Sequence, residues 1–165
     1  MARRREAQKR LPQQDRRFND VDVSLCINLM MVDGNKSISE RIFYKAMDHI
    51  KVKMHIDDHG ALAVYQKALS NVMPKVEVKS RRVGGATYQV PVEVKESRAK
   101  SLAIRWIIEA SRKRSGKSMI EKFTAEILDA VDEEGGGRGR GGAIKKRQDT
   151  EKMAEANRAF AHYRW

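Results

Sequence analysis

Three short stretches of the sequence contain residue types and spacings found in catalytic or cofactor-binding sites. Residues 137–142 read Gly-Arg-Gly-Arg-Gly-Gly, the glycine spacing of a dinucleotide-binding loop. That loop requires a preceding strand and an acidic residue about twenty positions later, whereas a helical pattern precedes it here and His162 occupies that place. Residues 116–118 read Gly-Lys-Ser, the end of a P-loop, but Ser111 stands where that motif begins with glycine. We therefore interpret residues 135–142 as a Gly/Arg linker.

The third stretch contains two histidines at the spacing of a helical zinc site. His55 and His59 are four residues apart, but Asp57 and Asp58 between them predict a turn and a helix cap instead of one helix face. Cys26 lies in an apolar run and is predicted to be a buried thiol. No Ser/His/Asp or Cys/His arrangement stands out, so we expect no catalytic residues, no metal and no cofactor.

Arg81 and Arg82, followed closely by Gly84 and Gly85, form the motif with the most specific chemistry. Guanidinium groups form forked hydrogen bonds with phosphates, and glycines allow the backbone to approach a sugar–phosphate chain closely. The residues on both sides alternate between apolar and polar, which predicts a β-hairpin arm at about 75–95. Two strands alone are marginally stable, so a hairpin that projects from a body usually has something to bind.

Helical periodicity in the rest of the chain predicts the body that holds this hairpin. The predicted helices begin near Asp20, Ser37, Asp58, Ser97, Ser118 and Asp149. The first ends at Gly34, and residues 37–40 and 118–121 are capping boxes at the starts of two others. Ile38 is expected on a buried helix face, and Tyr88 is expected to pack on the body more than to stack on a base. The predicted fold is mainly α, a bundle of about six helices with one protruding two-stranded β-hairpin.

The chain is strongly basic, and its charge is concentrated in segments. Its 165 residues include 34 Lys and Arg against 22 Asp and Glu, a net charge of +12. Basic residues are in excess over 1–17, 72–120 and 135–148, whereas 18–71 is nearly neutral and 121–134 is acidic. Several separate basic segments in one short chain indicate nucleic acid as the partner.

The length and composition fit one domain with an arm. We expect residues 1–17 to be a flexible basic N-terminal arm and residues 18–165 to be a single helical domain. A run of about 18 apolar residues is absent, which excludes a membrane-spanning chain, and no signal peptide is expected. A single cysteine excludes an internal disulfide framework and favours a reducing compartment.

Several stretches, in the same order along the chain, resemble the bacterial-type ribosomal protein seven of the small subunit. They are residues 30–34, 81–94, 105–106, 145–147 and 153–165. Residues 81–94 read RRVGGATYQVPVEV and residues 153–165 read MAEANRAFAHYRW, strings far more specific than a short motif. The resemblance covers nearly the whole chain. It implies a structural, non-catalytic protein that binds the 3′ major (head) domain of small-subunit rRNA and helps to nucleate assembly of the head.

The resemblance also implies which residues contact RNA. The rRNA-binding residues would be Arg3, Arg4, Arg5, Lys9, Arg10, Lys36, Lys75, Lys79, Arg98, Arg105, Arg112, Lys113 and Arg114. The residues near exit-site tRNA and messenger RNA would be Arg81, Arg82, Gly84, Gly85, Lys145, Lys146 and Arg147. The implied protein partners are neighbouring head proteins and protein eleven of the small subunit. The implied location is the cytoplasm, with an organelle ribosome left open.

Two other classes of function fit part of the sequence. Some architectural DNA-bending proteins use a basic β-arm with a proline in the minor groove, and Pro91 lies in the predicted arm. An RNA-modifying or RNA-cleaving enzyme is the third class, although the sequence lacks an acid–base or metal constellation. The sequence does not determine which nucleotides the protein contacts, whether the linker is ordered, or whether the protein regulates its own messenger. Binding to folded ribosomal RNA is the function that the sequence favours.

Overall fold

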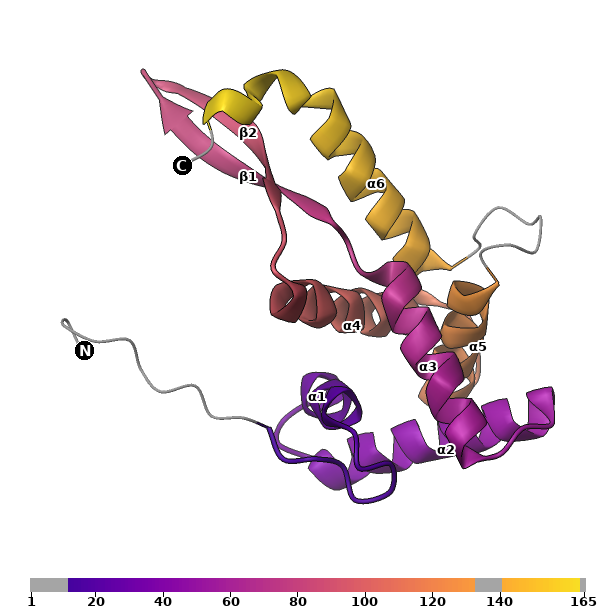
Figure 1. The fold of residues 1–165 in the computed structure, drawn as a ribbon. Helices are drawn as coiled ribbons and strands as arrows, with labels where there is room; N and C mark the ends of the chain where they lie inside the picture. Colours follow the sequence, from indigo (N-terminus) through magenta and orange to yellow (C-terminus); the bar gives the residue numbers. More distant parts are fainter. Residues whose placement is uncertain (1–11, 133–140, 164–165) are drawn as a thin grey trace.

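The computed structural model describes residues 12–132 and 141–163 (Figure 1). These residues form six α-helices, one two-stranded antiparallel sheet and a C-terminal 3₁₀-helix, which confirms the predicted fold class. The elements are α1 (Val21–Met30), α2 (Lys36–Met54), α3 (Asp58–Val72), β1 (Val76–Val83), β2 (Ala86–Glu93), α4 (Glu96–Lys113), α5 (Met119–Val131), α6 (Gly142–Ala156) and η1 (Arg158–Tyr163). None of the helices in these two ranges is long and apolar enough to cross a bilayer.

Helices α1 to α5 pack around one apolar core and form the body of the molecule. Phe43 of α2 lies at its centre, with its ring centroid 5.2 Å from that of Tyr65 and 6.0 Å from that of Phe123. All three rings are buried, and Ile104 and Ile107 extend the core along α4. Burial of these large apolar side chains fixes the rotation of α4 about its axis, and with it the set of α4 residues that face solvent.

The connection between α1 and α2 differs from the sequence prediction. Helix α1 ends at Met30, before the predicted stop at Gly34. Gly34 has a positive φ of 76°, and the turn that it forms leads the chain into α2 at Lys36. The predicted capping box at Ser37 is therefore wrong, because Ser37 already lies in the first turn of the helix. Ile38, predicted to be buried, is 45% exposed.

Of the predicted starts of the last two α-helices, one is confirmed and the other is wrong. The side chain of Ser118 accepts a hydrogen bond from the Glu121 backbone N–H, so the predicted start of α5 is confirmed. Helix α6 begins at Gly142, and the predicted start near Asp149 is wrong. Its first turn is capped from α5, because the carboxylate of Glu126 accepts the backbone N–H of Ala143 at 2.8 Å. A cap supplied from another helix leaves no local signal in the sequence.

Strands β1 and β2 form the predicted hairpin. They are joined by a two-residue turn, in which Gly84 and Gly85 have φ values of 57° and 91°. Both values lie in the left-handed region that glycine adopts without steric cost, as tight hairpin turns require. Figure 1 shows α6 and η1 running along the hairpin, with α6 packed on β1 and η1 on β2. The hairpin is therefore supported along its length by the C-terminal part of the chain.

Candidate nucleic-acid interface

The solvent face of α4 carries a row of three arginines. Arg98, Arg105 and Arg112 are separated by seven residues, which is close to two turns of helix, so they lie on one stripe. All three are exposed, while Ala103 and Ile104 of the same helix are buried in the core. Neighbouring arginines of the row lie about 10 Å apart along the axis. The helix thus presents an extended line of positive charge to solvent.

The hairpin end of this row is held in place by a carboxylate. Arg98 forms a forked ion pair with Glu77 of β1, with Nε 2.9 Å from both oxygens and Nη2 2.9 Å from Oε2. Lys79 lies 3.3 Å from the same carboxylate, which is only 11% exposed. The sequence analysis missed Glu77, although an acidic residue at the base of a basic hairpin was a usable signal. Glu77 fixes both cations in position and joins the hairpin to α4.

The other end of the row lies beside the start of α2. Arg112 donates a hydrogen bond of 3.2 Å to the last carbonyl of α1, and it lines a shallow pocket of about 240 Å³ with Asn35. Lys36 follows directly and forms an ion pair of 3.9 Å with Glu40 of its own helix. Arg105, in the middle of the row, has no hydrogen bond or ion pair with any residue that the structure describes. It is the member of the row whose guanidinium is most available to a ligand.

Five of the eight described residues that were predicted to bind rRNA lie along the base of the hairpin and α4. Lys75, at the start of β1, is exposed, and its carbonyl accepts the Val94 N–H at the base of the hairpin. We define the basic face as this lysine and the cations that continue from it along β1 and α4. Its members are Lys75, Lys79, Arg98, Arg105 and Arg112. The basic face runs from the base of the hairpin to the end of α4.

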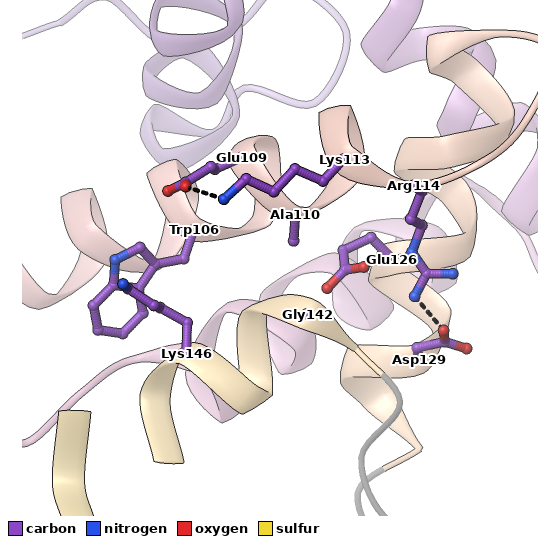
Figure 2. A pocket seen from close by; sticks show the side chains of 9 residues that line it. All are labelled: Trp106, Glu109, Ala110, Lys113, Arg114, Glu126, Asp129, Gly142 and Lys146. Atoms are coloured by element: carbon purple, nitrogen blue, oxygen red, sulfur yellow. Dashed lines mark hydrogen bonds and ion pairs between the residues drawn. The ribbon is translucent and has the colours of Figure 1, made fainter. Parts of the chain in front are cut away.

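Lys113 and Arg114 are not part of the basic face, and Figure 2 shows them at a pocket between α4, α5 and α6. Lys113 is paired with Glu109 at 2.6 Å and lines a pocket of about 480 Å³ between α4, α5 and α6. Arg114 turns toward α5, where its Nε donates to Glu126 at 2.6 Å and its Nη2 donates to Asp129. Burial lowers the pKa of Arg114, but its hydrogen bonds with Asp129 and Glu126 outweigh this and raise the pKa overall. Its contacts support a structural role that ties α4 to α5.

The cations predicted to lie near tRNA and messenger RNA fall into two separate places. Arg82 and residues 84–85 are exposed at the tip of the hairpin. Residues 145–147 lie in the first turns of α6, at the opposite end of the hairpin and next to the body (Figure 1). Within this group Arg147 donates a hydrogen bond to the carbonyl of Asn71 of α3, whereas Lys145 and Lys146 are exposed. The structure does not bring the two groups together.

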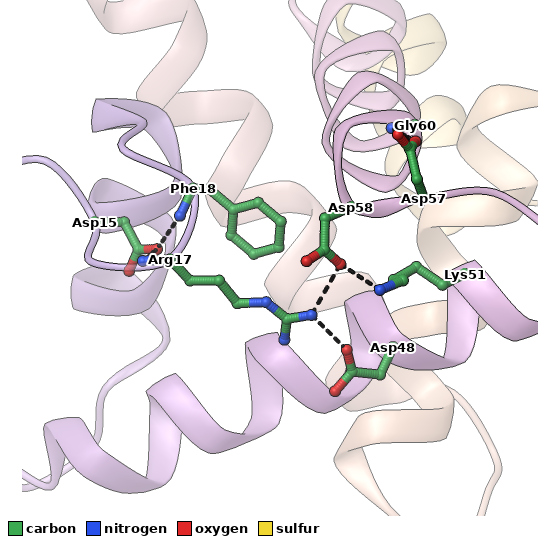
Figure 3. Close-up of polar contacts among 8 residues, drawn as sticks. All are labelled: Asp15, Arg17, Phe18, Asp48, Lys51, Asp57, Asp58 and Gly60. Carbon is green, nitrogen blue, oxygen red and sulfur yellow. Dashed lines mark hydrogen bonds and ion pairs between the residues drawn. The ribbon is translucent and has the colours of Figure 1, made fainter.

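The predicted N-terminal contacts lie outside the described residues, but the segment that follows them is visible. The predicted contacts are Arg3, Arg4, Arg5, Lys9 and Arg10. Asp15 is buried and accepts a hydrogen bond of 2.7 Å from the hydroxyl of Tyr44. Arg17 binds Asp48 at 2.7 Å and Asp58 at 3.0 Å (Figure 3). Residues 15–17 thus attach the N-terminal segment to α2 and α3.

The residues considered for catalysis or metal binding are not assembled into a site. His55 ends α2 in a left-handed conformation, and His59 is exposed in α3. Across residues 12–132 and 141–163, no three His, Cys, Asp or Glu side chains are grouped to hold a metal ion. Cys26 is buried, and desolvation raises the pKa of its thiol to about 12, so it is not a ready nucleophile. The basic face is the surface with the clearest binding chemistry in this part of the chain.

Comparison with known proteins identifies the family of the chain. The family described as Ribosomal protein S7p/S5e matches residues 2–158. Relatives called small ribosomal subunit protein uS7 come from Methylococcus capsulatus, Anaeromyxobacter sp. (strain K) and Trichlorobacter lovleyi. They are 52%, 54% and 53% identical over 165 residues, with 100% of both chains covered in each case. The resemblance seen in the sequence is confirmed, and the chain belongs to the ribosomal protein S7p/S5e family.

Proposed function

We propose that this protein is a structural constituent of the small ribosomal subunit that binds the 3′ major domain of its rRNA and helps to nucleate assembly of the head. The basic face carries the proposal, because its five cations are exposed and Glu77 is the carboxylate that pairs with two of them, Lys79 and Arg98. The relatives are named as small-subunit proteins, which supports the same assignment. Membership of a ribosomal-protein family makes the chain a ribosomal protein and not an enzyme.

The basic face supplies affinity through phosphate contacts. Guanidinium groups on α4 fork onto phosphate oxygens, and each phosphate that is neutralised releases counterions from the RNA. The ion pair between Glu77 and Arg98 holds the hairpin base and α4 at a fixed angle, so the cations match one arrangement of RNA helices. Specificity then comes from the shape of a multi-helix junction more than from base edges. Lys36, Lys113 and the N-terminal arm extend this contact area.

The hairpin tip is the second contact region in the proposal. Its exposed Arg82 and its narrow two-glycine turn fit an RNA backbone near the exit-site tRNA and the messenger path. Residues 145–147 contribute positive charge from the body end of α6. The proposed protein partners are neighbouring head proteins and protein eleven of the small subunit, in ribosomes of the cytoplasm.

The position of Pro91 argues against the DNA-bending alternative. Minor-groove arms insert an apolar wedge between base steps and kink the duplex. Pro91 pairs with Val78 within the hairpin, at a distance from the turn, and it lines a pocket with Ala154 and Arg158 of the C-terminal segment. Pro91 is therefore not at the exposed tip of the hairpin, where a wedge would have to enter a DNA groove.

Sedimentation tests the proposed function directly. The tagged protein, expressed in cells, is expected to sediment with small ribosomal subunits and to crosslink from the basic face to head-domain rRNA. Arg105→Ala should reduce crosslinking at that position, and Lys53→Ala, an exposed cation at the C-terminal end of α2, serves as the matched control. Sedimentation away from ribosomal subunits would overturn the proposal.

A further inference from the structure

The C-terminal 3₁₀-helix η1 covers one face of the hairpin. The ring of Tyr88 in β2 lies 5.2 Å from that of Phe160 and 5.1 Å from that of Tyr163, measured between centroids. Arg81 lies directly across from Tyr88 in β1 and donates a hydrogen bond to the carbonyl of Tyr163. Two segments 82 residues apart in the sequence are thus joined by aromatic packing and a charged hydrogen bond.

The opposite face of the same part of the hairpin is polar and open. Cross-strand partners share a face of the sheet and successive residues alternate, so Ser80, Arg82, Thr87 and Gln89 lie together. All four are exposed, and none of their side chains forms a hydrogen bond or ion pair with another described residue. We call these four residues the polar face. It contains one guanidinium, two hydroxyls and one amide, and no aromatic side chain.

Support from the C-terminus continues toward the base of the hairpin. Val90, on the same side as Tyr88, is only 2% exposed, and on the other side, below the polar face, Val76 and Pro91 line a pocket with Ala154 and Arg158. Since two strands alone are marginally stable in water, the order of the distal hairpin depends on what packs against it. In the described part of the chain that packing comes from α6 and η1.

We propose that η1 is a positioning element that holds the distal hairpin through Arg81 and Tyr88 and presents the polar face to an RNA sugar–phosphate backbone. The mixture of guanidinium, hydroxyl and amide groups suits phosphate oxygens and 2′-hydroxyls, while the absence of an aromatic ring excludes base stacking on this face. The identity of the ligand as RNA rests on the proposed function. The ordering of the hairpin by η1 does not depend on it.

Hydrogen exchange of the full-length protein tests the ordering. Tyr88→Ala should reduce amide protection in the distal hairpin by at least about tenfold, because the aromatic contacts with Phe160 and Tyr163 are lost. Amides of α2 to α5 should keep their protection. Tyr88→Phe retains the ring and is the matched control, expected to behave like the parent. Unchanged hairpin protection in Tyr88→Ala would overturn the proposal.

A second measurement tests presentation to RNA. Small subunits reconstituted with each variant are assayed for binding of deacylated tRNA at the exit site. Tyr88→Ala and Arg82→Ala should each weaken this binding by about tenfold, the size expected for loss of one charge-assisted hydrogen bond, while Tyr88→Phe should not. Loss of hairpin protection with unchanged tRNA affinity would overturn the positioning role. Failure of the parent protein to enter small subunits, with the exchange result intact, would instead contradict the proposed function.

Discussion

Arg81 and Arg82 are adjacent in the sequence, but the structure places them on opposite faces of the hairpin. Arg81 lies across from Tyr88 and donates a hydrogen bond to the carbonyl of Tyr163 in η1. Arg82 lies across from Thr87 and is exposed on the polar face. We predicted both to lie toward tRNA and messenger RNA, yet their surroundings differ. The two side chains are therefore expected to do different things.

Arg82→Ala is expected to weaken exit-site tRNA binding without changing the fold. Its side chain is exposed and forms no hydrogen bond or ion pair with a described residue, so the free energy of unfolding should change by no more than about 0.5 kcal/mol. Arg81→Ala should loosen η1 and increase amide exchange in the distal hairpin. Both variants should keep their affinity for head-domain rRNA, measured by filter binding. A complete loss of rRNA binding in either variant would contradict this division between the hairpin tip and the basic face.

Glu126→Ala is expected to destabilise the whole protein. The carboxylate is fully buried, pairs with Arg114 at 2.6 Å and accepts the N–H of Ala143 at the start of α6. Removal leaves the partly buried guanidinium of Arg114 with Asp129 as its remaining partner and leaves the start of α6 without its cap, which should lower the free energy of unfolding by about 3–5 kcal/mol. Urea denaturation measures this loss. Glu121→Ala, an exposed carboxylate on the same helix, should cost less than about 1 kcal/mol, and equal losses would contradict the role of Glu126.

Asp58→Asn is expected to remove part of the acid sensitivity of folding. A hydrogen bond from Lys51, aided by Arg17, holds the pKa of Asp58 below its ordinary value of 3.8. A carboxyl whose pKa is depressed on folding stabilises the protein above 3.8, and this stabilisation is lost as pH falls through the lower, folded-state value.

The difference in unfolding free energy between parent and Asp58→Asn should therefore be largest near neutral pH and shrink below about pH 4. Urea denaturation at a series of pH values measures it. Asp149→Asn replaces an exposed carboxylate of α6 that has no ion pair within the described ranges, and it serves as the control. A difference that grows as the pH falls would contradict the assigned ion pairs.

Arg105→Ala is expected to change the salt dependence of rRNA binding. Arg105 has no partner among the described residues, so its removal should cost little stability but should eliminate about one phosphate contact. The plot of log affinity against log salt concentration should become less steep by about 0.7–0.9. Lys53→Ala should leave the slope unchanged. An unchanged slope for Arg105→Ala would show that the basic face is not the rRNA contact surface.

Local patterns predicted most of the fold. Period-two alternation predicted both strands, and the pair Gly84-Gly85 predicted the turn, because these signals depend only on neighbouring residues. The start of α6 was missed because Glu126 of α5 supplies its cap. Arg114 was assigned to rRNA through the family resemblance, whereas its pairing with Asp129 depends on how α4 packs on α5.

The candidate site was likewise predicted only where local sequence patterns determine the arrangement of its residues. Strand alternation alone places Arg81 and Arg82 on opposite faces. Which face is covered depends on the packing of Phe160 and Tyr163, which are distant in the sequence. The five residues of the basic face were named through the family resemblance, whereas the pairing of Glu77 with Arg98 depends on how the hairpin packs on α4.

Competition binding tests the central claim, recognition of folded ribosomal RNA, most directly. Labelled 3′ major domain RNA of the small subunit is bound to the full-length protein over a series of salt concentrations, with unlabelled duplex DNA of equal length as competitor. The affinity is expected to fall steeply as the salt concentration rises. Each phosphate contacted should contribute about 0.7–0.9 to the slope of log affinity against log salt concentration. Excess duplex DNA should not displace the RNA. An affinity that is insensitive to salt, or equal displacement by duplex DNA, would contradict the account.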